Sequence, residues 1–367
     1  MGREEQITAR QFTILVALYT MGDAILYLPG QFIMDAKQDA WIASIFSIVE
    51  IFSVVLLLTV LGKRYPGLSL LDYMEGILGK FFGKILLSYF VAFCFLDVSI
   101  LLMEVGDFMG SQIFPKTPTD VILLLFMSIV VLAARLGPEA THRTSEMMFP
   151  FIVVLFLFMI IALSPRIELK NIQPIMAHGL FPVIKASRVL FGFFLDSVAL
   201  LILFPLVKQP NAATKSFYKG TAIGGVIIIL ISTASVLVLG VDTISRHAFP
   251  VYTLGKKISI GNFVERIEII FTVLWFTSLF FKSYLFFIST TQGVSKLFGL
   301  KNDKIIALPI AFVMVLIGRI LFPSRASFEE WSTIHWLSHA IPFGLGIPVI
   351  LLLVDFFRKQ WIKMRAK

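Results

Sequence analysis

The chain has 367 residues, of which 57% are hydrophobic and only 15% charged, and its mean hydropathy is +0.89. This is more apolar surface than a soluble core can bury, so the composition excludes a soluble globular protein and predicts an integral membrane protein. The net charge of +9 does not predict a nucleic-acid partner, because the basic residues are distributed by membrane topology.

Ten segments are apolar and long enough to cross the hydrocarbon core of a bilayer, which requires roughly 20 residues per helix. In chain order they cover residues 12–34, 40–61, 82–106, 119–135, 146–163, 188–207, 218–240, 266–291, 304–322 and 336–357. Only short connections remain between them. We therefore expect an all-α integral membrane protein in which residues 1–367 form a single transmembrane domain.

The basic residues predict the orientation of these spans. Nineteen Lys and Arg residues lie on the side that holds both termini and 12 lie on the other side. Cytoplasmic loops carry the excess of positive charge, so both termini are expected in the cytoplasm. The C-terminal cluster supports this orientation and can contact anionic lipid headgroups; it consists of Arg358, Lys359, Lys363, Arg365 and Lys367.

The first and sixth spans each contain a pattern that favours a break in the helix. Gly22 and Asp23 precede Pro29 in the first span, and Gly192 and Asp196 precede Pro205 in the sixth. Glycine and proline also occur in unbroken membrane helices, but matching positions with an Asp at each favour a binding site. Ten spans with both ends on one side also divide into two inverted halves of five, about 12–163 and 188–357.

Five charged residues lie near the middle of the apolar segments: Asp23, Glu50, Asp97, Asp196 and Lys282. A charge at membrane depth costs at least about 2.5–3.5 kcal/mol, so such residues usually face a bundle interior and mark a site or a pathway. Glu50 is expected to be a helix-packing partner. The other four are expected to belong to a functional site.

Two of these residues have more specific expectations. Asp97 shares a face of the third span with Glu104 and Asp107, and Phe93 and Tyr89 lie one and two turns before it, where they line the same cavity or serve as core aromatics. Lys282 is expected to be a countercharge to one of the central Asp residues or a direct ligand contact. A structural ion pair that locks helices together is the alternative for Lys282.

Several short motifs resemble the B subunits of nutrient germinant receptors of endospore-forming bacteria, also called spore permeases. These proteins belong to the amino acid/polyamine/organocation transporter superfamily. The motifs are Gly22 with Leu28-Pro29, the segment from Tyr65-Pro66 to Leu70, Asn171 to Pro174 with Gly179 and Pro182, and Glu265-Arg266-x-Glu268. Together they span essentially the whole chain.

The resemblance implies a LeuT-like fold of two inverted five-helix repeats with broken helices 1 and 6 around a small-molecule site. It also implies residence in the inner membrane of the endospore, in a complex with a larger A subunit and a C lipoprotein subunit. The B subunit of this family senses a nutrient, an amino acid or another small metabolite, and triggers germination. A proton-coupled amino acid permease is the alternative function.

We expect the following residues to form the ligand site: Gly22, Asp23, Ala24, Ile25, Tyr89, Phe93, Asp97, Phe194, Asp196, Ser197, Phe281 and Lys282. The Asp23 carboxylate would repel a ligand carboxylate and would suit an amine, a cation or a proton. No nucleotide-binding loop, nucleophile elbow or HExxH motif occurs, so we expect neither an enzyme nor a cofactor. His335 and His339 lack a third zinc ligand, so no metal site is expected.

Overall fold

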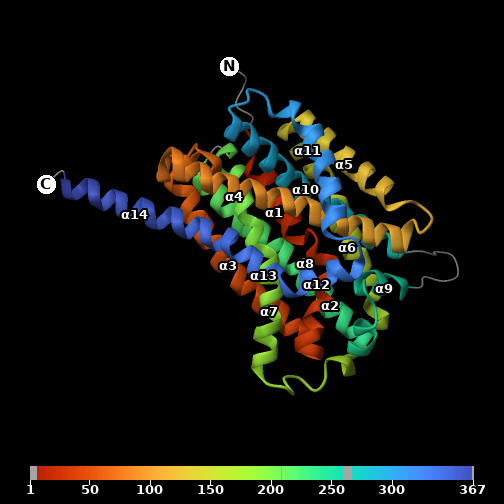
Figure 1. The fold of residues 1–367 in the computed structure, drawn as a ribbon. Helices are drawn as coiled ribbons and strands as arrows, with labels where there is room; N and C mark the ends of the chain where they lie inside the picture. The colour runs from red at the N-terminus through yellow and green to blue at the C-terminus, as the bar shows by residue number, and fades with distance from the viewer. Residues whose placement is uncertain (1–5, 208, 259–266, 366–367) are drawn as a thin grey trace.

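The computed structural model describes residues 6–207, 209–258 and 267–365, which form a helical bundle (Figure 1). Glu265 and Arg266, part of one family-like motif, lie outside the described residues. The α-helices within these ranges are α1 (Ala9–Met21), α2 (Ala24–Ala36), α3 (Ala40–Arg64), α4 (Leu70–Phe108), α5 (Thr119–Leu136), α6 (Pro138–Leu163), α7 (Leu180–Leu195), α8 (Pro210–Ser245), α9 (Pro250–Lys256), α10 (Glu268–Phe298), α11 (Ala307–Leu321), α12 (Arg325–Ile334), α13 (Trp336–Ile341) and α14 (Ile347–Arg365).

Within the described residues, seven helices are long and apolar enough to cross a membrane. An eighth span results if α11 and α12, which are bent by 92° at a short break, count as one. The first and sixth predicted spans do not pass this test as single helices, because each is divided by a break. The multi-pass membrane character is thus established, whereas the count of ten spans and the division into two repeats stay predictions.

Small residues allow α1 to pack closely against α8 in the centre of the bundle. A Cβ atom at Gly220 would lie 2.5 Å from the Val16 Cβ, and one at Gly224 would lie 2.6 Å from the Thr20 Cβ. Helices in membranes associate through such close contacts, because burial of apolar surface gives no advantage over lipid. The N-terminal helix is therefore held in the interior of the bundle.

The connections before α7 and before α10 differ from each other in structure. Residues 249–254 contribute to the short helix α9, which is largely buried. Residues 171–182 are not a half-helix, because a 3₁₀ turn ends at Ile172 and α7 begins only at Leu180. Asn171 instead donates a hydrogen bond of 3.0 Å from Nδ2 to the Leu237 carbonyl, which fixes this loop to α8.

The C-terminal helix α14 extends away from the bundle at its far end (Figure 1). Asp355 anchors its middle part by accepting hydrogen bonds from Tyr65 and, at 3.1 Å, from Arg64 Nη1, both at the end of α3. Lys359 adds an ion pair of 3.0 Å to Asp355. The contacts of Asp355 with Tyr65 and Arg64 hold α14 to α3, and Phe357 in the same part of α14 is exposed.

Candidate functional site: a buried ionic cluster between two helix breaks

The first span is broken at Gly22, as predicted. Gly22 has φ 30° and ψ −127°, its N–H donates to the Leu18 carbonyl, and α2 begins two residues later at Ala24. Asp23 caps α2 by accepting a hydrogen bond of 3.1 Å from the Ala24 N–H. The freed Gly22 carbonyl accepts a hydrogen bond of 3.1 Å from Ser278 Oγ of α10, so the break is held from a second helix.

The sixth span is also interrupted, although it is not unwound. Helix α7 ends at Leu195, and the 3₁₀ helix η5 (Asp196–Ile202) continues the chain, followed by a second 3₁₀ turn, η6 (Phe204–Leu206), that contains Pro205. A 3₁₀ helix has fewer residues per turn and weaker hydrogen-bond geometry than an α-helix, and in mid-helix it often marks a hinge. The change places Asp196 at the junction.

Lys282 joins the two breaks. Its Nζ lies 2.8 Å from Asp23 Oδ1 and 2.7 Å from Asp196 Oδ2. The Tyr19 hydroxyl donates a hydrogen bond of 2.6 Å to the other oxygen of Asp196, and the Lys282 ammonium lies 5.3 Å from the centroid of the Tyr19 ring. Tyr19, Asp23, Asp196 and Lys282, here called the ionic cluster, therefore connect α1, α2, η5 and α10.

The ionic cluster is removed from solvent. The exposed fractions are 1% for Lys282, 4% for Asp23 and 0% for Asp196. Charges buried to this extent are tolerated only when they are paired and hydrogen-bonded, and removal of one partner leaves the others uncompensated. The sequence predicted that Lys282 pairs with a central Asp residue but did not decide between Asp23, Asp97 and Asp196. The structure pairs Lys282 with two of them.

Acidic groups outnumber basic groups in this region. Asp97 on α4 is buried and interacts electrostatically with Asp196 and Lys282, yet its Oδ2 has no hydrogen-bond partner among the described residues. Glu104, two turns further along α4, is buried too, and its Oε2 is likewise unpaired within the described part of the chain. The interior can therefore accept a proton or the positively charged group of a ligand.

Two cavities lie on opposite sides of the ionic cluster. The larger, here called the vestibule, has a volume of about 730 Å³, and its walls include Tyr27, Lys37 and Arg325. The other has a volume of about 510 Å³ and lies beside Gln6 and Gln292, toward the N-terminal end of α1. Helix α2 runs from Asp23 toward the vestibule, whereas α10 runs from Lys282 toward the second cavity. The buried cluster separates the two.

Not all of the predicted site residues gather at the cluster. Tyr89 is 39% exposed on the surface of α4. Eight residues turn an α-helix by 80° beyond two full turns, so Tyr89 does not share the face of Asp97. Phe93 is buried but stacks on Phe343 at a centroid distance of 3.6 Å and on His339 at 4.7 Å. It packs against the C-terminal segment.

The remaining predicted residues are buried near the breaks. Ala24 and Ile25 begin α2, Phe194 lies in the last turn of α7, and Phe281 precedes Lys282 and packs against Phe280. Ser197 follows Asp196, and its Oγ has no hydrogen-bond partner among the described residues. These positions lie near the cluster. Their roles as ligand contacts stay a prediction.

Glu50 of α3 lies outside the cluster and was expected to be a helix-packing partner. Glu50 Oε1 accepts a hydrogen bond of 3.0 Å from Ser187 Oγ of α7, in line with a role in helix packing. No group of three metal-ligating side chains occurs among the described residues.

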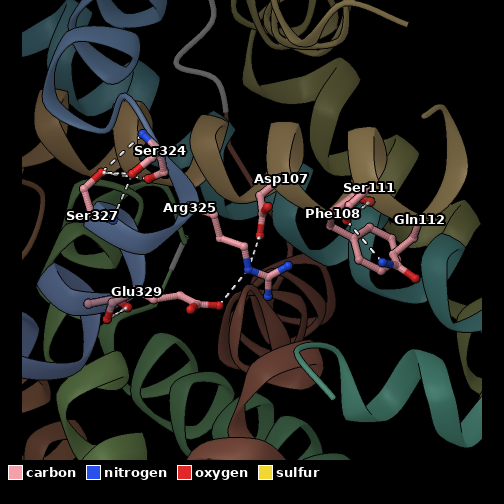
Figure 2. A network of polar contacts seen from close by, with 9 residues as sticks. Asp107, Phe108, Ser111, Gln112, Ser324, Arg325, Ser327 and Glu329 are labelled. Carbon is pink, nitrogen blue, oxygen red and sulfur yellow. Dashed lines mark hydrogen bonds and ion pairs between the residues drawn. The ribbon is translucent and has the colours of Figure 1, made fainter. Parts of the chain in front are cut away.

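Two parts of the site were not predicted from the sequence. Tyr19 is one helical turn before Asp23, a spacing that could have indicated a shared face. The second is a network at the vestibule, in which Arg325 of α12 lies between Asp107 of α4 and Glu329 (Figure 2). No local sequence signal connects Arg325 with Asp107, because the two residues are far apart in the chain.

Replacing Tyr19 by phenylalanine is expected to lower the free energy of unfolding by about 1–3 kcal/mol, because it leaves a buried Asp196 oxygen without its donor. Thermal unfolding of the purified protein in detergent measures this loss. Tyr27→Phe is the matched control, because the Tyr27 hydroxyl has no hydrogen-bond partner among the described residues. Equal losses for both variants would contradict a stabilising role of the Tyr19 hydroxyl.

Solved structures with a similar fold include transporters. The structure of MhsT in complex with L-phenylalanine aligns with a TM-score of 0.65 at 15% identity and covers 97% of this chain and 99% of that one. A second structure is that of Mhp1, a nucleobase-cation-symport-1 family transporter in a closed conformation with bromovinylhydantoin bound. It aligns with a TM-score of 0.69 at 14% identity, and the alignment covers 94% of this chain and 78% of that one. At this identity the likeness establishes a LeuT-like fold and confirms the predicted fold class.

Curated relatives are spore germination proteins. Spore germination protein KB of Bacillus subtilis (strain 168) is 26% identical over 361 residues, which is 97% of this chain and 96% of the relative. Spore germination protein YndE of the same organism is 25% identical over 366 residues, which is 97% of this chain and 98% of the relative. The family described as "Spore germination protein", the spore permeases, matches residues 6–324. With a family match over most of its length and a transporter-like fold, this chain belongs to the spore germination protein family as a permease-like, multi-pass membrane protein.

Proposed function

We propose that this chain is the nutrient-sensing subunit of a spore germination receptor and that it binds a small metabolite beside the ionic cluster. The observation that carries this proposal is the position of Lys282, whose ammonium holds Asp23 and Asp196 together at two helix breaks. Ionisable residues at membrane depth typically mark a ligand or ion pathway. Here they lie where two interrupted segments meet, so a change at the cluster alters how these segments pack.

The excess of acidic groups suggests how a ligand acts. A ligand with a positively charged group can pair with Asp97 or compete with Lys282 for Asp23 or Asp196. Such competition lengthens the contacts that join α1 and α2 to η5 and α10. A ligand shifts a conformational equilibrium only through different affinities for the two states, and an occluded cluster that rearranges on binding provides this difference.

The proposal includes the partners and the location that the family resemblance implies. The receptor would also contain an A subunit and a C lipoprotein subunit, and it would lie in the inner membrane of the spore with both termini in the cytoplasm. The relatives named as germination proteins support this assignment. The basic residues that flank the end of α14 support a cytoplasmic C-terminus.

A proton-coupled amino acid permease is the second candidate. It is favoured by Asp97, whose Oδ2 has no hydrogen-bond partner among the described residues, and by a fold shared with transporters. In this case Asp97 or Asp23 would take up a proton in each transport cycle, and the substrate would move from the vestibule to the second cavity.

The decisive experiment uses spores in which this chain is the only B subunit present. A panel of amino acids, amines and sugars is tested, and the fall in optical density that accompanies germination is followed. At least one nutrient is expected to trigger germination, and deletion of the chain is expected to abolish that response. If spores with and without the chain respond identically to the whole panel, the receptor proposal is wrong.

Reconstituted vesicles separate the two candidates. A permease would accumulate a labelled amino acid from the panel when a proton gradient is imposed, and Asp97→Asn would remove this accumulation. A receptor subunit is expected to bind the nutrient without accumulating it. Co-purification of a large multi-spanning subunit and a lipoprotein with the tagged chain from spores would further support the receptor.

A further inference from the structure

The guanidinium group of Arg325 is held in place along one edge. Its Nε donates a hydrogen bond of 2.7 Å to Glu329 Oε1 and lies 3.7 Å from Asp107 Oδ2 (Figure 2). The guanidinium carbon lies 4.8 Å from the centroid of the Phe249 ring, a cation–π contact. Three neighbours from α4, α12 and the segment before α9 therefore fix the orientation of the group.

The opposite edge of the same group is open. Neither Nη atom donates a hydrogen bond to any residue of the described part of the chain, and both point away from Asp107 (Figure 2). Arginine has five N–H donors, four of them on these two atoms. Arg325 lines the vestibule of about 730 Å³, so these donors are available to a molecule inside it.

The charge of the vestibule differs from that of the interior beneath it. Lys37, Arg246 and Arg325 line the vestibule together with two carboxylates, Asp107 and Glu329, which leaves an excess of positive charge. Deeper in the bundle the acidic groups are in excess, as described above. The excess of charged groups therefore changes from basic at the vestibule to acidic around the ionic cluster.

We propose that the free edge of Arg325 is a carboxylate-binding subsite in the vestibule. The planar fork formed by the two Nη atoms matches a carboxylate in a bidentate arrangement, and the contacts at Nε preorganise it. The role of this subsite in nutrient recognition rests on the proposed function, because the vestibule would be the route of the ligand.

The subsite also fixes the orientation of a ligand that carries both a carboxylate and an ammonium group. Tyr27 lines the vestibule and lies one helical turn after Asp23 on α2, so the vestibule leads toward the acidic interior. A carboxylate held by Arg325 leaves the ammonium group directed toward the acidic interior. This arrangement avoids the repulsion between Asp23 and a ligand carboxylate.

A chemical protection experiment tests the subsite on the purified chain without reference to germination. An arginine-selective dicarbonyl reagent is applied, and modification of Arg325 is followed by mass spectrometry with propionate or its uncharged counterpart, propionamide. Propionate is expected to slow modification of Arg325, and propionamide is not. Arg10 is the internal control, because its Nε pairs with Glu146 at 3.2 Å and it does not line the vestibule. Equal effects of both probes at Arg325 would overturn the proposal.

Variants test the role of the subsite in nutrient recognition. Arg325→Gln is expected to raise the half-maximal concentration of carboxylate-bearing nutrients about 10- to 100-fold, as expected for loss of a charge-assisted pair, and to leave carboxylate-free nutrients unchanged. Arg325→Lys, which keeps the charge and loses the fork, is expected to show a smaller but still selective effect. Arg10→Gln is the matched control, because it also removes an arginine whose Nε pairs with a carboxylate. Equal losses for both nutrient classes would show that Arg325 acts only as a structural ion pair.

The two proposals can fail separately. Selective protection of Arg325 by propionate, together with unaltered germination of spores that lack the chain, would retain the subsite and refute the receptor function. A nutrient response that depends on the chain, without any protection by propionate, would retain the function and refute the subsite.

Discussion

Lys282→Met is expected to abolish nutrient-triggered germination and to destabilise the protein by about 3–5 kcal/mol, the usual cost of removing one partner from a buried ion pair. The reason is that Asp23 and Asp196 lose the ammonium that lies 2.8 and 2.7 Å from them, in a place without access to solvent. Germination of variant spores and thermal unfolding of the purified chain measure the two effects.

Instability alone could account for a lost response, so a second variant is required. The triple variant Asp23→Asn, Asp196→Asn, Lys282→Met removes all three charges together, and replacing a whole buried ionic group is often neutral or stabilising. It is expected to reach the membrane at normal abundance and still give no response. A normal response of the triple variant would show that the cluster is structural only.

Lys296→Met is the matched control for the same substitution on the same helix. Lys296 pairs with Asp72 at 2.5 Å, but both side chains are partly exposed. Exposed ion pairs contribute about 0–1 kcal/mol, so this variant is expected to retain both stability and response. A loss equal to that of Lys282→Met would mean that any charge removed from α10 disturbs the receptor.

Gly22→Ala is expected to destabilise the protein by about 2–5 kcal/mol and to abolish the nutrient response. An added Cβ would lie 2.8 Å from Lys282 Cδ and 2.8 Å from the Tyr19 carbonyl oxygen, at a backbone φ of +30°. The substitution therefore strains the backbone at residue 22, and the new methyl group also displaces Lys282, which joins the two breaks. Thermal unfolding and germination assays measure both effects.

Gly299→Ala separates backbone strain from displacement of Lys282. Gly299 has φ +67° in the left-handed region, and a Cβ there would meet nothing within 4 Å. This control is expected to lose only the strain energy of a left-handed backbone, about 1–2 kcal/mol, and to keep the nutrient response. If both glycine variants lose the response equally, contact with Lys282 is not the cause.

Local sequence features were sufficient to predict the breaks in the first and sixth spans. A glycine or a proline alters the helix through its own backbone, so the break at Gly22 could be located without knowledge of its neighbours. The form of the second break could not be predicted in this way. Whether the chain unwinds at Asp196 or tightens into a 3₁₀ helix depends on how α7 and η5 pack against the rest of the bundle.

The error at Tyr89 has a similar origin. Spacing along a helix identifies residues that share a face over one or two turns, but the error in angle grows with distance from Asp97. The face that lies against the bundle is decided by neighbouring helices. Phe93 is buried because the C-terminal segment brings Phe343 onto it, and nothing within α4 itself indicates that contact.

The sequence by itself determined that this chain crosses the membrane repeatedly, that charges lie within its spans and that the first span is broken at Gly22. These properties follow from the composition and from the local conformational preferences of single residues. Only the tertiary structure decided that Lys282 pairs with Asp23 and Asp196, that Tyr19 joins them, and that Arg325 presents one free edge to the vestibule. Pairing between distant residues depends on distance and direction in three dimensions, which helix packing sets and no local pattern encodes.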